Sequence, residues 1–268
     1  MSKINNPMEI YKLLDKSNCR QCSEATCLAF AAAVFRGQKK LDQCPRLDPG
    51  IVARFADGAS VREEIKRDQD KVLQRLQGRI AAVDLARAAE RLGGRHADGK
   101  LTLKILGKDF SVDDKGRLSS DIHIHSWIAV PVLSHILEGA GRRLTGQWVS
   151  FRELQNGRAR YPLFEQRCEK ALQKVADRYP DLFEDMIHIF NGRQVDNHYA
   201  SDISLVLRPL PLVPVLICYW KPDDGLASTL NLFFDASVEY NLSIEALFAL
   251  TAGLVTMFEK LALRHGIQ

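Results

Sequence analysis

Four cysteines within the first 44 residues constrain this chain more than any other feature of its sequence. They follow the spacing Cys19-x2-Cys22-x4-Cys27-x16-Cys44, and Pro45 comes directly after the last one. A 4Fe-4S cluster needs four thiolates that converge on one cube, and iron-sulfur proteins supply them from short loops plus one distant cysteine. The spacing therefore predicts one 4Fe-4S cluster bound by these four thiols.

A structural zinc site is the alternative for the same cysteines, because closely spaced thiolates also bind zinc in a tetrahedral arrangement. The spacers of 4 and 16 residues and the proline after Cys44 are more typical of an iron-sulfur loop than of paired zinc knuckles. We therefore favour iron and keep zinc as the competing interpretation.

The local sequence around the cysteines predicts short helices. Residues 25–36 are alanine-rich and predict a helix that Gly37 would end. Cys27 would then lie in the first turn, where free amides and the positive end of the helix dipole face an anionic cluster. Pro7 predicts the start of an earlier helix, and residues 47–50 predict a turn at the edge of the cysteine module.

The remainder of the chain predicts a mixed α+β fold, because helical and extended patterns follow one another without regular alternation. A long helix over 60–92 would begin at a capping box at Ser60 and break at Gly78. The other expected elements are a hairpin over 101–112, helices over 128–137, 161–190 and 244–263, and strands over 147–151, 201–208, 213–220 and 229–234.

The expected organisation is a small helical module followed by a larger domain. We assign the cluster module to residues 1–50, a helical connector to 51–99 and an α+β domain to 100–268. A chain of 268 residues is long enough for one large core and a second small one.

Charge and apolar segments limit the classes of function. A formal net charge of +4, without basic blocks, argues against a nucleic-acid-binding protein. No targeting segment follows Met1, and the most apolar stretch, residues 242–258, contains Glu245 and predicts a core helix, not a membrane span. Cys168 and Cys218 are expected to be buried free thiols, which fits a cytoplasmic protein.

Two other groups of residues have the chemistry to bind a ligand, although each has a simpler explanation. His123 and His125 alternate along an expected strand, but no further ligand lies at a suitable spacing, which favours ordinary histidines. Asp223 and Asp224 precede a glycine and predict a turn, and Asp235 is expected to end a strand. No nucleophile elbow, phosphate loop or zinc-protease motif is present, so the sequence assigns no catalytic residue.

The segment from Cys19 to Ala31, CRQCSEATCLAFA, together with Cys44-Pro45, resembles a known iron-sulfur module. It is similar to the N-terminal 4Fe-4S module of the corrinoid iron-sulfur protein large subunit and to that of the B subunit of the Rnf-type electron-transport complex. The resemblance covers about residues 1–50. It implies that the four cysteines hold a low-potential cluster that passes single electrons.

Three positions depart from the pattern of these relatives, which usually have glycine after each of the first two cysteines and often proline two residues before the third. Arg20, Ser23 and Ala25 stand at those positions. Because Arg20 adds a fixed positive charge near the cluster, it should stabilise the reduced form and raise the reduction potential. The region after residue 100 resembles an uncharacterised family that is often fused behind this module.

These features predict an iron-sulfur protein that transfers single electrons to a redox partner. The resemblance implies a partner such as a ferredoxin or a corrinoid protein, and reactivation of an oxidised corrinoid is the narrowest form of that expectation. The alternative is a binding or maturation module in which the cluster is structural or sensory.

Overall fold

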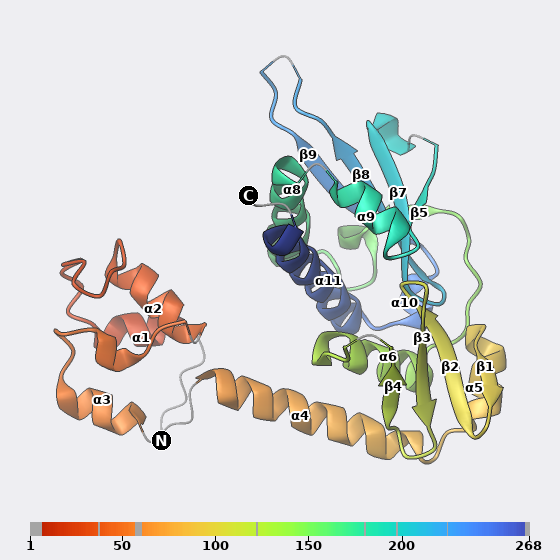
Figure 1. The fold of residues 1–268 in the computed structure, drawn as a ribbon, viewed down its shortest axis with the longest axis horizontal. Helices are drawn as coiled ribbons and strands as arrows, with labels where there is room; N and C mark the ends of the chain where they lie inside the picture. Colours follow the sequence, from red (N-terminus) through yellow and green to blue (C-terminus); the bar gives the residue numbers. More distant parts are fainter. Residues whose placement is uncertain are drawn as a thin grey trace. The chain divides into compact units, whose positions relative to one another are not determined.

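The computed structural model of the protein describes residues 7–36, 38–56, 61–121, 123–179, 181–196, 198–223 and 225–265. The chain forms two compact units, Met1–Val72 and Leu73–Gln268, and each is described by itself (Figure 1). The finer division into residues 1–50, 51–99 and 100–268 stays a prediction.

The smaller unit is a set of short helices around one small apolar core. It contains α1 (Pro7–Leu13), α2 (Cys27–Phe35), the 3-10 turn η1 (Leu41–Gln43), α3 (Pro49–Ala56) and most of α4 (Val61–Ile80). Its buried core residues are Ile10, Leu14, Cys27, Phe30, Ala31, Val34, Cys44 and Leu47. The turn expected at residues 47–50 is wrong from Pro49 onward, because proline is favoured in the first turn of a helix and begins α3 here.

The larger unit contains two antiparallel sheets, which together with its helices confirm the α+β class. The four-stranded sheet has the order β1-β2-β3-β4, from β1 (Arg95–Ala97), β2 (Lys100–Ile105), β3 (Lys108–Asp113) and β4 (Leu118–Ser120). The five-stranded sheet has the order β5-β9-β8-β7-β6, from β5 (Trp148–Ser150), β6 (Arg193–Gln194), β7 (Ile203–Leu210), β8 (Val213–Trp220) and β9 (Thr229–Asp235). The strands expected in this second sheet are confirmed to within two residues at each end.

The hairpin expected over 101–112 is formed by β2 and β3. Its two turn residues, Leu106 and Gly107, have left-handed φ angles of 49° and 79°, which match the twist of the paired strands. The amide of Leu106 also donates a hydrogen bond to the carbonyl of Arg208 at 3.0 Å. This bond joins the hairpin to β7 and so connects the two sheets.

Helices pack beside the sheets of the larger unit. Helices α8 (Lys170–Arg178) and α11 (Ile244–His265) pack against each other, α8 contacts β9, and α6 (Ser126–Glu138) packs against α11 (Figure 1). Helix α5 (Leu85–Leu92) covers β1 and β2. The short elements are α7 (Tyr161–Phe164), α9 (Leu182–His188), α10 (Val238–Asn241), η2 (Phe151–Glu153) and η4 (His198–Ala200).

The helix expected over 60–92 is divided into α4 and α5, and the break lies beyond Gly78. Asp84 explains its position: the carboxylate accepts hydrogen bonds from the amides of Ala86 and Arg87 at 3.0 and 3.1 Å. These bonds satisfy free amides in the first turn of α5 and fix its start. Ser60, the capping residue expected at the beginning of the long helix, lies outside the described residues.

Glu169 is a carboxylate buried in the larger unit. A π-helical turn, Glu165–Glu169 (η3), separates α7 from α8, and Glu169 at its end is only 2% exposed. Its oxygens accept hydrogen bonds from the amide of Leu232 at 3.0 Å and from the hydroxyl of Tyr161 at 2.9 Å. Burial raises the pKa of Glu169, and these two hydrogen bonds oppose that effect.

Helix α11 is apolar and packs in the core of the larger unit, as the sequence predicted for residues 242–258. Its core side chains include Leu247, Leu250, Leu254 and Phe258. Within the described ranges, Ile244–Arg264 is the one helix that could cross a bilayer by length and composition, a test that core helices also pass, and 44% of its apolar window is buried. Cys168 and Cys218 are also buried, as expected.

Candidate metal centre

Helix α2 begins at Cys27, so this cysteine lies in the first helical turn, as the sequence predicted. Thr26 caps the helix, because its backbone is extended at φ −144° and its hydroxyl accepts a hydrogen bond from the amide of Ala29 at 3.0 Å. Threonine directly before a helical pattern is a capping signal that sequence reasoning missed. Gly37, the expected end of the helix, lies outside the described residues.

The loop that carries Cys19 and Cys22 has an unusual backbone. Four residues that are not glycine, Lys16, Asn18, Arg20 and Ser23, have left-handed φ angles of 61°, 51°, 60° and 61°. Where left-handed residues interrupt a right-handed chain, successive amides turn toward one side and form a nest that binds anions. A left-handed conformation costs an ordinary side chain about 1–2 kcal/mol. Arg20 and Ser23 stand where the resembling families carry glycine, and their φ angles explain that preference.

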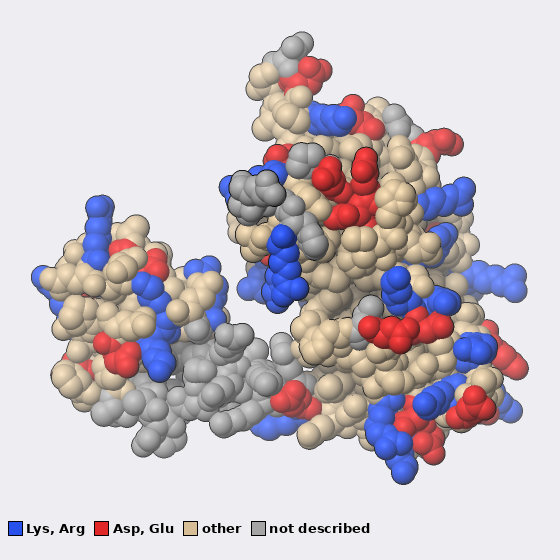
Figure 2. Space-filling model, in the orientation of Figure 1, with Lys and Arg blue, Asp and Glu red and all other residues tan. Residues whose placement is uncertain are grey.

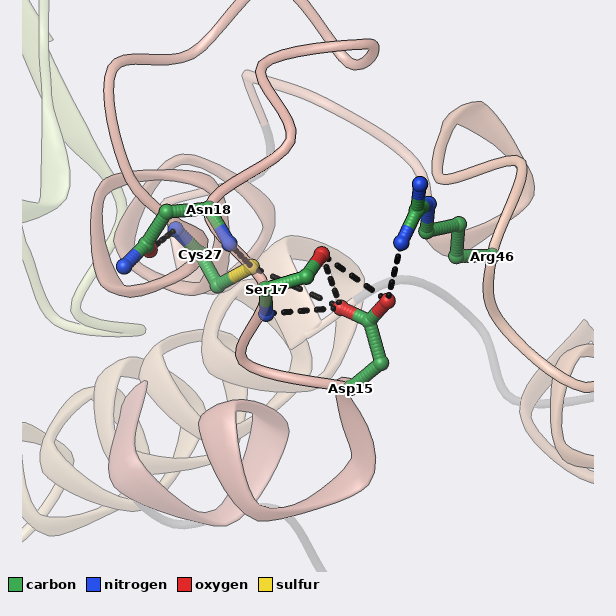
Figure 3. A network of polar contacts seen from close by, with 5 residues as sticks. All are labelled: Asp15, Ser17, Asn18, Cys27 and Arg46. Atoms are coloured by element: carbon green, nitrogen blue, oxygen red, sulfur yellow. Dashed lines mark hydrogen bonds and ion pairs between the residues drawn. The ribbon is translucent and has the colours of Figure 1, made fainter.

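Two hydrogen bonds tie this loop to the start of α2 (Figure 3). The amide of Asn18 donates to the sulfur of Cys27 at 3.4 Å, and the amide of Cys27 donates to Oδ1 of Asn18 at 2.8 Å. Asparagine tolerates the left-handed region better than most residues, which suits its place in this loop. An amide directed at a sulfur stabilises negative charge there, which is one way in which proteins tune an iron-sulfur cluster.

A carboxylate lies on the other side of the same sulfur. Oδ1 of Asp15 is 3.8 Å from Sγ of Cys27 (Figure 3). The amide and the hydroxyl of Ser17 donate hydrogen bonds to Asp15 at 3.1 and 2.9 Å, and these bonds lower the pKa of its carboxyl group. The guanidinium of Arg46 lies 3.5 Å from Oδ2 of Asp15. A negative charge therefore stands beside Cys27, with a positive charge paired to it.

A second segment brings Cys44 to the same module. Burial raises the pKa of the Cys44 thiol, and a hydrogen bond from the backbone amide of Arg46 opposes this effect. Lys39 connects the segment to the first loop, because its ammonium donates to the carbonyl of Cys22 and lies 3.4 Å from the carboxylate of Glu24.

The four cysteines differ in their surroundings. Cys27 and Cys44 belong to the core of the module, whereas Cys19 and Cys22 are partly exposed. The amide of Gln21 hydrogen-bonds to Cys19 and lowers the pKa of its thiol. In the described part of the chain, no three Cys, His, Asp or Glu side chains form a group that could hold a metal ion. The four thiols lie in one module, and their chemistry and amide donors fit an iron-sulfur cluster. Among the described residues, however, their side chains do not converge on one metal position.

The other candidate ligands give no metal site. The strand expected around His123 and His125 is wrong, because these residues form the lead-in to α6, where His125 is the N-cap residue. Their ring centroids are 4.3 Å apart, and burial, His123 and the nearby Lys260 all lower the pKa of His125. Asp223 lies in the expected turn. Asp224 lies outside the described residues.

Asp235 serves as a hydrogen-bond acceptor within the fold. It is 1% exposed and accepts from the amide and hydroxyl of Thr145, both at 3.0 Å, and from the amide of Gly146 at 2.7 Å. The amide and hydroxyl of Ser237 donate to it at 2.9 and 2.6 Å. Five donors therefore surround this carboxylate and fix the chain before β5 to the end of β9.

A pocket of about 190 Å³ opens at the start of α11. Two carboxylates line it, and both have partners: Glu239 accepts from the amide of Gln155 at 3.1 Å, and Glu245 pairs with Arg160 at 2.5 Å. Because one carboxylate is ion-paired and the other accepts a backbone hydrogen bond, we assign no ligand to the pocket.

Comparison with protein families distinguishes the same two parts of the chain. A family described as "Putative Fe-S cluster" matches residues 14–46, which include all four clustered cysteines. A family described as "Domain of unknown function (DUF3786)" matches residues 84–257, more than half of the chain. No solved structure matches the chain.

Curated relatives match the N-terminal region. The chain is 51% identical over 45 residues to the acetyl-CoA decarbonylase/synthase complex subunit gamma 2 of Methanosarcina thermophila, a match that covers 17% of this chain and 10% of the relative. It is 53% identical over 38 residues to the corrinoid/iron-sulfur protein large subunit of Moorella thermoacetica, covering 14% and 8%. The chain thus spans about a tenth of the length of these relatives. The matches confirm the resemblance to the corrinoid iron-sulfur protein large subunit and identify the N-terminal module as an iron-sulfur module.

Proposed function

Because the chain belongs to the family described as domain of unknown function DUF3786 and carries an N-terminal iron-sulfur module, we propose that it is an electron-transfer protein. One 4Fe-4S cluster, bound by Cys19, Cys22, Cys27 and Cys44, supplies one-electron redox chemistry when present. The observation that carries the proposal is the presence of these four thiols in one small module, with backbone amides directed at two of the sulfurs.

The residues around the cysteines support an anionic cluster. The N-terminus of α2 places positive partial charge beside Cys27, and the amide of Asn18 donates directly to its sulfur. The Cys19–Cys22 loop also contains left-handed residues, which are typical of loops whose amides bind anions. Such donors stabilise negative charge on sulfur, as the thiolate ligands of an iron-sulfur cluster require.

The exposure of the cysteines supports electron transfer at the surface. Cys19 and Cys22 are partly exposed, whereas Cys27 and Cys44 lie in the core of the module. One side of the site therefore faces solvent, where a redox partner can approach, and the other side anchors the site to the fold. Electron transfer through the exposed side requires no opening of the module.

We propose a redox protein such as a ferredoxin, or a corrinoid protein, as the partner. The relatives named above include a corrinoid/iron-sulfur protein and a subunit of an acetyl-CoA decarbonylase/synthase complex. Basic and acidic side chains are interspersed on the face shown in Figure 2, so an electrostatic docking patch would be local. The free cysteines support a location in the reducing cytoplasm.

Anaerobic purification of the full chain tests cluster binding. We expect a brown protein with equal amounts of iron and acid-labile sulfide, and broad visible absorbance that bleaches on reduction with dithionite. Cys218→Ala is the matched control, because this buried cysteine lies in the larger unit and its loss should leave the iron content unchanged. A colourless protein that carries zinc and no sulfide would contradict the proposal.

A structural or sensory cluster is the second candidate function. The supporting observation is that Cys27 and Cys44 are part of the small core, so loss of the cluster would also disturb the packing of the module. Reversible one-electron reduction near ferredoxin potentials, with the fold retained, would support electron transfer. A cluster that resists reduction, and whose removal unfolds the module, would support the structural role.

A further inference from the structure

Arg46 joins the two ligand segments of the cysteine module. It lies two residues after Cys44, and its guanidinium is 3.5 Å from Oδ2 of Asp15, which precedes the Cys19–Cys22 loop (Figure 3). Asp15 in turn lies 3.8 Å from the sulfur of Cys27. This ion pair connects the segment just after Cys44 to the segment before the Cys19–Cys22 loop, in addition to the contact between Lys39 and the carbonyl of Cys22.

The carboxylate of Asp15 is a difficult neighbour for an iron-bound sulfur. If the sulfur of Cys27 were bound to iron it would be a thiolate, and the carboxylate of Asp15, 3.8 Å away, would then lie beside a second negative group. Asp15 cannot easily turn away, because the amide and the hydroxyl of Ser17 hold it in place. Like charges at this separation repel each other unless a positive charge compensates them.

We propose that Arg46 is a positioning residue for the cluster: through its ion pair with Asp15 it neutralises the carboxylate that lies beside Cys27. This inference rests on the proposed function, since it concerns the same cysteines. Outer residues that orient the ligands of a metal typically change metal affinity about 10–100-fold when they are removed. The pair also explains how a carboxylate can stand so close to a ligand of an anionic cluster.

A set of variants of the full chain separates this role from a general loss of structure. Arg46→Met removes the compensating charge, Asp15→Asn removes the charge that needs compensation, and the double variant removes both. Arg36→Met is the matched control, because Arg36 is an exposed cation of the same module without an ion pair among its described neighbours. Each apoprotein is mixed anaerobically with ferrous iron and sulfide, and the cluster is followed by visible absorbance and by iron and sulfide content.

We expect Arg46→Met to form the cluster about 10–100-fold more slowly, or to release it that much faster to a chelator. Asp15→Asn combined with Arg46→Met should recover most of this loss, and Arg36→Met should behave as the wild type. The rescue is informative because a variant that merely misfolds would not be repaired by a second substitution. Arg46→Lys, which keeps the charge, should retain part of the effect.

The inference is overturned if Arg46→Met assembles the cluster as the wild type does, or if Asp15→Asn fails to rescue it. In both cases, cluster formation by the wild-type chain would leave the proposed function intact. A wild-type chain that takes up no iron and sulfide under these conditions would overturn the proposed function and the inference together.

Discussion

The cysteine module and the DUF3786 domain obtain their structure in different ways. In the module, four left-handed residues that are not glycine fall within residues 16–23, and two of the eight core residues are cysteines. In the larger unit, regular antiparallel sheets and long helices surround a continuous apolar core. A strained loop over a small core is stable only with additional interactions, which a metal centre supplies. We therefore expect the module, but not the domain, to depend on the cluster.

Loss of one cysteine ligand should have the largest effect, and this effect should be confined to the cysteine module. Cys27→Ser removes a buried sulfur at the start of α2, and we expect bound iron to fall to a small fraction of the wild-type content. Amide hydrogen exchange should then become fast in α1 and α2 while the amides of β7, β8 and β9 stay protected. Cys218→Ser, in the larger unit, is the control that should retain iron. Equal loss of protection in both units would show that they do not fold independently.

A core substitution in the domain should destabilise the domain and leave the cysteine module unchanged. Phe164 is fully buried and stacks on Phe151, with ring centroids 4.0 Å apart. Phe164→Ala should lower the free energy of unfolding of the domain by about 3–5 kcal/mol, because it leaves a cavity in the core. Denaturant unfolding measures this change, and the iron content should be unaffected. Leu163→Ala is the matched control, since Leu163 is 52% exposed.

The buried carboxylate of Asp235 predicts that the stability of the domain depends on pH. Burial alone would raise the pKa of Asp235, but hydrogen bonds from Ser237, Thr145 and Gly146 outweigh it, so the folded pKa lies below its usual value. Asp235 therefore contributes stability above its unfolded pKa of about 3.9, and loses that contribution as the pH falls toward the lower folded pKa.

Asp235→Asn should cost about 1–3 kcal/mol of domain stability near neutral pH, because buried donors lose their acceptor. The difference from the wild type should shrink as the pH falls below about 4. Denaturant unfolding at several pH values measures it, with the exposed Asp223→Asn as control. A difference that stays constant down to the lowest pH would contradict the assigned pKa direction.

The smallest expected effect concerns the strain in the cysteine loop. Arg20→Gly should stabilise the holo module by about 1 kcal/mol, because glycine adopts a φ of 60° without a steric cost. Gln21→Gly is the control and should destabilise it by about 0.5–1 kcal/mol, since Gln21 has no left-handed backbone and glycine adds freedom to the unfolded chain. The half-life of the cluster in the presence of a chelator measures the stability of the two variants. Similar behaviour of both variants would show that Arg20 is not strained.

The sequence predicted the parts of the structure that local patterns determine. Alternating apolar residues identified the β2–β3 hairpin, apolar runs rich in β-branched residues identified β7 and β8, and the alanine-rich segment placed Cys27 in a first helical turn, whereas the short strand β6 was not predicted. The break between α4 and α5 was placed wrongly because glycine was weighted more than Asp84, a capping residue whose signal is present in the sequence. The start of α3 at Pro49 was missed in the same way.

The candidate site could be predicted only in part, because its ligands are local in sequence but their environment is not. Asp15 and Arg46 are 31 positions apart, and Lys39 reaches the carbonyl of Cys22 across 17 positions. No periodicity relates such residues, since their proximity depends on how the loops fold around the core. The positive φ angles of Arg20 and Ser23 were not predicted either. The glycines at these positions in related modules were a signal for them.

The π-helical turn before α8 has a consequence for the register of that helix. From Tyr161 to Arg178 the chain is helical, and the turn at Glu165–Glu169 places one extra residue in the path. Each residue of an α-helix advances the rotation by about 100°. Deleting one residue from this turn would rotate Glu169 out of the core, away from the amide of Leu232. The buried carboxylate thus depends on a single-residue insertion in the helix.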